Sequence, residues 1–283
     1  TGQPFFLAVG FLKPHLPFVA PRRYWDLYDP EKLQLPAQRK PPEGAPPVAL
    51  AVALDELRDT YPLDVRVPPP GVPADPDAEA YPLPRGAPLT PEQQVNLLRG
   101  YYACVSFVDA QFGRIMAELE RRGLAENTIV VVLGDHGFHL GHHGLWGKLT
   151  NFEESVRAPL LIAAPDRRAA GQATSALVEL VDVYPTLCEL AGLPLPPHLE
   201  GVSVAPVLDD PARAVKAAAF SQYPRPGAMG RSMRTERYRF TAWESAAEPG
   251  PTLLFETTDP AVDTAGADHL GGRPRHQELT ARL

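Results

Sequence analysis

The chain has 283 residues, enough for one large domain or two modest ones, and 44% of them are hydrophobic. Its formal net charge of -7 argues against a nucleic-acid partner. No apolar run reaches the roughly 20 residues that a membrane-spanning helix needs. The two cysteines, Cys104 and Cys188, lie within apolar helical patterns, so we expect buried free thiols.

The first predicted element is an interior strand over residues 4–10, a run of apolar side chains. It leads into a loop in which Pro14 and Pro17 flank His15 and restrict where the imidazole points. A buried strand without any lead-in indicates that a further segment precedes it in the intact protein. A short helix is expected over residues 24–28.

Residues 36–91 contain nearly half of the 34 prolines and show little periodicity, apart from a helical pattern over residues 50–58. A loop of this length without regular structure is usually functional or disordered. We therefore predict an insertion that packs over the edge of the sheet.

A long helix is predicted after this insertion. Thr90 is its expected N-cap, Pro91 occupies the first helical position, and Gln93 completes a capping box. Apolar residues recur at helical spacing as far as Leu119 and define a buried face. Gly123 is expected to end the helix.

Residues 128–133 predict a buried strand, because they are mostly β-branched and are closed by Gly134. Asp135 and His136 follow at the C-terminal end of this strand, where open α/β sheets place their ligand sites. A carboxylate and an imidazole with Lys148 nearby suit a cation that neutralises an oxyanion such as sulfate or phosphate.

Three more histidines lie in the same glycine-rich run, namely His139, His142 and His143. We interpret His139 as a residue that supports the site or lines its rim. His142 and His143 are interpreted as loop-packing or substrate-rim residues.

A strand over residues 159–164 and a helix over residues 183–191 continue the alternation of strands and helices. This alternation predicts an α/β domain with a mostly parallel sheet flanked by helices, over residues 1–215. From residue 216 onward, short strand patterns are separated by Gly, Pro and charged turns. We therefore predict a small α+β subdomain with an antiparallel sheet over residues 216–283.

Five segments together resemble the type I sulfatases of the alkaline-phosphatase-like superfamily, and within them the iduronate-2-sulfatase branch. They are residues 4–10 with 13–15, 100–109, 135–148, 151–153 and 230–235. The Asp-His-Gly segment also occurs in related phosphoester hydrolases. The Lys-Pro-His segment, combined with the Trp-Gly-Lys and Asn-Phe-Glu segments, is more specific.

The resemblance implies hydrolysis of sulfate esters with calcium and a formylglycine nucleophile. By the same resemblance Asp135 and His136 are metal ligands, and Asp135 helps to deprotonate the hydrated nucleophile. Lys148 and His15 are implied catalytic residues: Lys148 supplies charge to a non-bridging sulfate oxygen, and His15 binds or protonates the bridging oxygen. The implied substrate is a sulfated small molecule or glycan, in particular one that contains uronic acid, and the implied location is periplasmic or secreted.

The chain also departs from the family pattern. The family nucleophile lies in a Cys-or-Ser, x, Pro-or-Ala, Ser, Arg motif, which neither Cys104 nor Cys188 matches. No Asp-Asp metal pair follows an N-terminal strand, and the family carries both features upstream of the segment equivalent to Thr1. We therefore expect the N-terminal part of the fold to be missing and the isolated chain to be inactive. The alternatives are a phosphodiesterase or phosphonate monoester hydrolase of the same superfamily, and a non-catalytic protein that binds anions or glycans.

Overall fold

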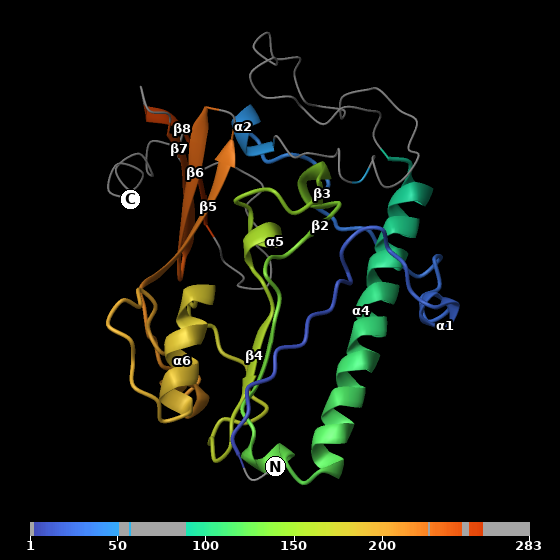
Figure 1. The fold of residues 1–283 in the computed structure, drawn as a ribbon. Helices are drawn as coiled ribbons and strands as arrows, with labels where there is room; N and C mark the ends of the chain where they lie inside the picture. The colour runs from blue at the N-terminus through green and yellow to red at the C-terminus, as the bar shows by residue number, and fades with distance from the viewer. Residues whose placement is uncertain (1–2, 51–56, 58–88, 226, 245–248, 257–283) are drawn as a thin grey trace. The chain divides into compact units, whose positions relative to one another are not determined.

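The computed structural model describes residues 3–50, 57, 89–225, 227–244 and 249–256 (Figure 1). The chain divides into two compact units. Unit 1 comprises Thr1–Leu35, Glu56–Asp64 and Leu89–Ala125, and unit 2 comprises Pro36–Asp55, Val65–Pro88 and Glu126–Leu283. This division differs from that of the predicted domains, whose boundary after residue 215 stays a prediction. Within the described ranges, no helix combines the length and the apolarity needed to cross a bilayer.

Unit 1 is built on α4 (Pro91–Arg121), the long helix that the sequence predicts. The Thr90 hydroxyl accepts a hydrogen bond from the backbone N–H of Gln93 at 3.2 Å, and the Gln93 side chain accepts one from Thr90 N at 2.8 Å. The short helix α1 (Arg22–Trp25) packs against α4 and begins slightly earlier than predicted. Gly100 permits this contact, because a Cβ there would lie 2.8 Å from the Trp25 ring.

The prediction of an interior strand over residues 4–10 is wrong for this structure. The segment belongs to no sheet, and its side chains are exposed, with Phe6 at 86% and Leu7 at 67%. A strand needs a hydrogen-bonded neighbour, and no described strand pairs with this segment. Apolar composition alone does not supply that neighbour.

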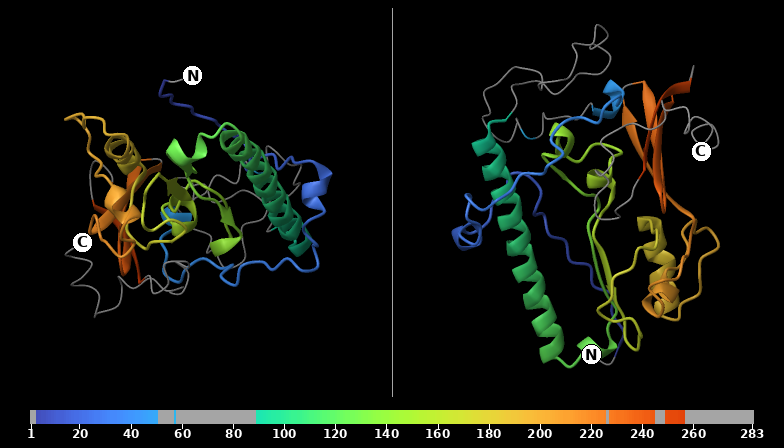
Figure 2. Two further views of the ribbon diagram at one scale, coloured as in Figure 1. Left: turned by 90° about the horizontal axis from the view of Figure 1, so that it is seen from below. Right: turned by 180° about the vertical axis from the view of Figure 1, so that it is seen from behind.

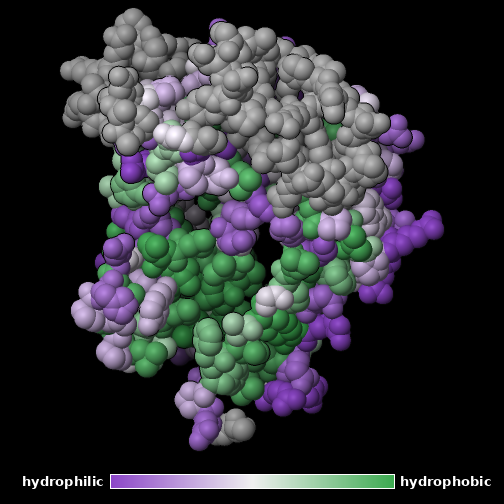
Figure 3. All heavy atoms as spheres, turned by 45° about the horizontal axis from the view of Figure 1, so that its top comes forward, coloured by the Kyte–Doolittle hydropathy of each residue, from purple (hydrophilic) through white to green (hydrophobic). Residues whose placement is uncertain are grey.

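Unit 2 contains the predicted strands around the Asp-His motif, β1 (Val130–Leu133) and β4 (Leu160–Ala163). The prediction that the first of them is buried is wrong for this structure, because its valines are partly exposed and Leu133 is 47% exposed. They pair antiparallel, with Val130 opposite Ala163. All strand pairs among the described residues are antiparallel, so these strands do not form the predicted mostly parallel sheet. The long connection between β1 and β4 is folded into a small hairpin and the four-residue helix Glu153–Val156, and it contains no long helix that returns the chain to the start of β1, as a parallel crossover would. Leu161 of β4 is 61% exposed. Figure 3 shows that hydrophobic residues form part of the molecular surface.

The connection between β1 and β4 holds the candidate site. It contains β2 (His139–Leu140), η2 (His142–Gly144), β3 (Trp146–Gly147) and α5 (Glu153–Val156). The strands β2 and β3 pair antiparallel, with His139 opposite Gly147. The helix η2 forms the turn between these two strands. The hairpin therefore places His139 beside Gly147, which directly precedes Lys148.

The predicted C-terminal antiparallel sheet is confirmed. Its strands, in spatial order, are β5 (Ala218–Arg225), β6 (Ala228–Thr235), β7 (Tyr238–Glu244) and β8 (Pro249–Glu256). Its inner face contributes Trp243, Leu253 and Phe255 to a core that also includes α2 (Pro47–Leu50) and Phe152. The views from the front and from behind both show α2 beside this sheet (Figure 2).

The predicted helix over residues 183–191 is confirmed as α6 (Val183–Leu190), which follows η3 (Leu180–Asp182). The remaining short helices are η1 (Ala125–Asn127) and η4 (Ala205–Leu208). Lys216 lies just before β5 in the chain and forms ion pairs with residues at η3. Its ammonium group lies 2.6 Å from Glu179 and 2.7 Å from the buried Asp182.

Candidate active site

Asp135 and His136 lie side by side on the loop that leaves β1. The Nδ1 atom of His136 is 2.7 Å from the carbonyl oxygen of Gly137. If Nδ1 carries the proton that this carbonyl accepts, the lone pair of Nε2 is left available. Nε2 lies 3.7 Å from Oδ2 of Asp135, whose side chain is 87% exposed. The two groups therefore present an oxygen and a nitrogen ligand on the same accessible loop.

Gly137 gives this loop its shape. Its N–H donates a hydrogen bond to the carbonyl oxygen of Ser155 at 2.7 Å. A Cβ at this position would lie 2.1 Å from the carbonyl oxygen of Glu154, closer than real contacts allow. Only glycine lets the backbone of the Asp-His loop lie directly against α5.

Lys148 follows β3 at the other end of the same connection, and its side chain is partly exposed. Its carbonyl oxygen accepts a hydrogen bond from Thr150 N at 2.7 Å. His15 belongs to unit 1, where its Nδ1 lies 2.8 Å from the carbonyl oxygen of Leu16. The structure thus places Asp135, His136 and Lys148 on one connection of unit 2. That His15 acts on the same substrate as these residues stays a prediction.

The same connection brings the buried His139 and His143 next to Glu154, whose side chain is 13% exposed. His139 is fully buried, and its Nε2 lies 2.9 Å from the hydroxyl oxygen of Thr150. Glu154 lies 3.5 Å from Nε2 of His143 and 4.0 Å from Nδ1 of His139. His139 and His143 therefore pack the interior of the loop, in agreement with the supporting and loop-packing roles predicted for them.

The charge states of this cluster follow from its burial. Burial lowers the pKa of His139 from 6.5 to about 3, so the imidazole is neutral at neutral pH. Burial alone would raise the pKa of Glu154, but the hydrogen bond from His143, the charge interactions with His139 and His143 and a backbone hydrogen bond together outweigh it and lower this pKa to about 2. Sequence reasoning missed Glu154, because a carboxylate in a short polar stretch carries no signal of burial.

The donor atoms of Asp135 and His136 fit part of a calcium site. The exposed carboxylate of Asp135 supplies a hard oxygen ligand, which calcium prefers, and His136 supplies a nitrogen ligand beside it. Within the described ranges, no group of three or more His, Cys, Asp or Glu side chains is arranged to hold a metal ion. The described part of this chain therefore offers two ligands and not a complete set.

Comparisons with known proteins show the family of this chain. The family profile described as Sulfatase matches residues 1–193, and the profile described as N-sulphoglucosamine sulphohydrolase, C-terminal, matches residues 141–283. The chain belongs to the sulfatase family. Iduronate 2-sulfatase from Mus musculus is 32% identical over 305 residues, which cover 86% of this chain and 52% of that protein. The chain thus spans about half the length of the curated relative.

Solved structures confirm the predicted alkaline-phosphatase-like sulfatase fold. The phosphonate monoester hydrolase from Silicibacter pomeroyi has a TM-score of 0.74 and 29% identity, covering 100% of this chain and 55% of that chain. A structure described as a complex with its substrate D-glucosamine-2-N,6-O-disulfate has a TM-score of 0.74 and 22% identity, covering 96% and 62%. The latter similarity shows the fold alone.

Proposed function

We propose that this chain is part of an enzyme that hydrolyses sulfate esters, in particular those of a glycan that contains uronic acid. The observation that carries the proposal is the pairing of Asp135 and His136, with 3.7 Å between Oδ2 and Nε2, on the connection that also holds Lys148. The similarity to iduronate 2-sulfatase supports the uronic-acid part of the proposal.

Each residue has a distinct chemical task in this proposal. Asp135 and His136 would hold calcium, which supplies positive charge to the sulfate oxygens when bound. Lys148 donates a hydrogen bond to a non-bridging sulfate oxygen and balances the charge that develops there. As an oxygen nucleophile forms a bond to sulfur and the bond from sulfur to the bridging oxygen breaks, His15 donates a proton to the bridging oxygen, so that the sugar leaves as an alcohol.

The nucleophile is not among the cysteines of this chain. Cys104 and Cys188 are both buried free thiols, and neither lies in the motif that is converted to formylglycine in sulfatases. The nucleophile is therefore proposed to come from a formylglycine segment outside these 283 residues.

The first test is sulfate release from an aryl sulfate in the presence of calcium. We expect no turnover by this chain alone, and turnover by a protein that joins it to a formylglycine segment. In that protein, Asp135→Asn and Lys148→Met are each expected to lower kcat/KM at least about 100-fold, the scale for loss of one transition-state contact. Glu200→Gln, at an exposed carboxylate of unit 2, serves as the matched control and should leave kcat/KM unchanged. Turnover by the isolated chain would contradict the proposal.

Calcium binding gives a readout that does not depend on turnover. Calorimetric titration should show weaker calcium binding by Asp135→Asn than by Glu200→Gln. Equal calcium binding by the two variants would remove Asp135 from the proposed metal site.

Hydrolysis of phosphonate esters is a second candidate function, favoured by the 29% identity to the Silicibacter pomeroyi enzyme. The two functions are distinguished by kcat/KM for an aryl sulfate and for a phenyl phosphonate ester under the same conditions. A higher value for the phosphonate would assign the site to the second function. Binding of sulfate without turnover of either ester would favour the non-catalytic alternative.

A further inference from the structure

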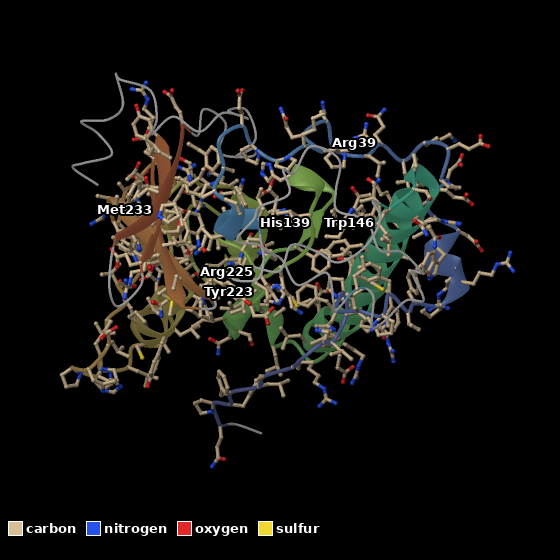
Figure 4. All side chains as sticks on the ribbon, turned by 90° about the horizontal axis from the view of Figure 1, so that it is seen from above. Arg39, His139, Trp146, Tyr223, Arg225 and Met233 are labelled. Carbon is tan, nitrogen blue, oxygen red and sulfur yellow. The ribbon has the colours of Figure 1, made fainter. Side chains whose placement is uncertain are left out.

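The inner face of β5 carries a row of polar and aromatic side chains. Ser221, Tyr223 and Arg225 alternate along this strand with exposed neighbours, so the three point to the same side of the sheet. Figure 4 labels Tyr223 and Arg225 on the side of the sheet toward His139, whereas Met233 is labelled on the other side. The row therefore faces the interior of unit 2.

Arg225 has an unusual environment for a charged group. Its Nε and Nη2 atoms are buried and have no hydrogen-bond partner within the described part of the chain. Its guanidinium carbon lies 4.9 Å from the centre of the Tyr223 ring. Burial lowers the pKa of this guanidinium from its ordinary value, although arginine stays charged at neutral pH. Two buried guanidinium nitrogens without hydrogen-bond acceptors are energetically costly, which is the reason to look for a ligand that would accept from them.

The unpaired atoms define the chemistry of the missing partner. Nε and Nη2 form one edge of the planar guanidinium and can donate two parallel hydrogen bonds. Two oxygens of a carboxylate or a sulfate match this edge, whereas a hydroxyl group can occupy only half of it. The Tyr223 ring lies against a face of the guanidinium and uses neither of these two donors.

More unpaired polar atoms lie next to Tyr223 on the same face. Gly230 is opposite Tyr223 in the sheet, and a Cβ on Gly230 would lie 2.6 Å from Asn151 Oδ1 and 2.8 Å from Trp243 Nε1. Both of these atoms are buried without a hydrogen-bond partner in the described residues. The side chain of Asn151 donates to the carbonyl oxygen of Gly230 at 3.3 Å. Since Asn151 follows Lys148 closely in the chain, this contact joins the inner face of the sheet to the candidate active-site connection.

We propose that Arg225 binds the carboxylate of an acidic sugar through Nε and Nη2, with Tyr223 holding the guanidinium in place. This assignment rests on the proposed function, in which the sulfate group is already bound by Asp135, His136 and Lys148. A carboxylate is then the second anionic group that a sulfated uronic acid presents. Its two coplanar oxygens match the planar edge of the arginine.

The test measures binding of methyl glucuronide, methyl glucoside and inorganic sulfate to the full 283-residue chain by NMR titration. We expect the chain to bind methyl glucuronide at least about tenfold more tightly than methyl glucoside, as a two-bond ion pair would allow. Arg225→Lys keeps the charge but loses the paired donors, and should abolish most of this preference, as should Arg225→Gln. Arg231→Lys is the matched control, because Arg231 is exposed on β6 and pairs with Glu244.

The outcomes separate this inference from the proposed function. Removing an unpaired buried charge should not destabilise the fold, so the Arg225→Gln variant remains measurable. Equal binding of glucuronide and glucoside by the unaltered chain, or an unchanged preference in Arg225→Lys, would overturn the role of Arg225. Sulfate that competes as well as glucuronide would overturn the choice of a carboxylate. Aryl sulfates carry no carboxylate, so failure of their hydrolysis would count against the proposed function alone.

Discussion

The Nε2 atom of His139 lies 2.9 Å from the hydroxyl oxygen of Thr150, and this contact closes the connection that carries Asp135 and Lys148. The Thr150 hydroxyl also lies 2.8 Å from the hydroxyl of Ser155 and accepts a hydrogen bond from Phe152 N at 3.2 Å. One buried hydroxyl therefore links β2, the turn after β3 and α5.

Replacing Thr150 by Val should destabilise the chain. The change keeps the shape of the side chain but leaves the partners of a buried hydroxyl unsatisfied, which costs about 1–3 kcal/mol. Thr174→Val is the control, because the hydroxyl of Thr174 makes its hydrogen bonds at an exposed position. Urea unfolding of both variants measures the difference, and equal losses would contradict the linking role of Thr150.

His139 makes the stability of the chain depend on pH. Its pKa is about 3 in the folded chain, whereas the ordinary value for histidine is 6.5, so below pH 6.5 the unfolded chain takes up a proton that the folded chain excludes. The free energy of unfolding should therefore fall as the pH falls from 6.5 toward 3, by up to about 1.4 kcal/mol per pH unit. Glu154, with a pKa lowered from 4.5 to about 2, adds a further loss below pH 4.5.

The measurement is urea unfolding at several pH values between 7 and 5. His139→Gln should flatten the pH dependence in this window, because the titrating group is gone. His198→Gln removes an exposed histidine and should leave the slope unchanged. The same slope in all three proteins would show that His139 is not the source.

The close approach of Gly137 to Glu154 predicts that Gly137→Ala is destabilising. The added Cβ would meet a backbone carbonyl at 2.1 Å, and such overpacking costs about 1–3 kcal/mol or more. Gly113→Ala in α4 is the matched change, because a Cβ there meets nothing within 4 Å. That variant should gain about 0.5–1 kcal/mol from helix propensity. Thermal unfolding of the two variants tests whether Gly137→Ala lowers the melting temperature and Gly113→Ala raises it.

Lys216 predicts a second stability difference. Burial alone would lower the pKa of Lys216, but its hydrogen bonds to Asp182 and Glu179 and the negative charges of these two carboxylates together raise it. Lys216→Met would leave two shielded carboxylates without their cation, at a cost of about 3–5 kcal/mol. Lys32→Met breaks an exposed pair with Asp29 and should cost less than about 1 kcal/mol. If Lys216→Met and Lys32→Met lower the free energy of unfolding by similar amounts in chemical denaturation, the ion pairs of Lys216 do not stabilise the chain more than an exposed pair does.

Local signals in the sequence determined several parts of this protein. The capping residues Thr90 and Gln93 located the start of α4, because a capping box depends on residues only three apart. Short strand patterns separated by Gly, Pro and charged turns predicted the C-terminal antiparallel sheet from residue 216 onward, since turn residues are visible in the local sequence. The order of Asp135, His136 and Lys148 sufficed to place them on one connection.

Only the tertiary structure decided which groups are buried and what they meet. Residues 4–10 have the composition of an interior strand and yet lie exposed, because pairing depends on a neighbour that composition does not reveal. Glu154 contacts His139 and His143 only because the connection folds back on itself. In the sequence nothing distinguishes Arg225 from the other arginines. Only the structure shows that its Nε and Nη2 atoms are buried without a hydrogen-bond partner among the described residues. Burial and long-range contacts set the energies of these groups, and neither is a property of local sequence.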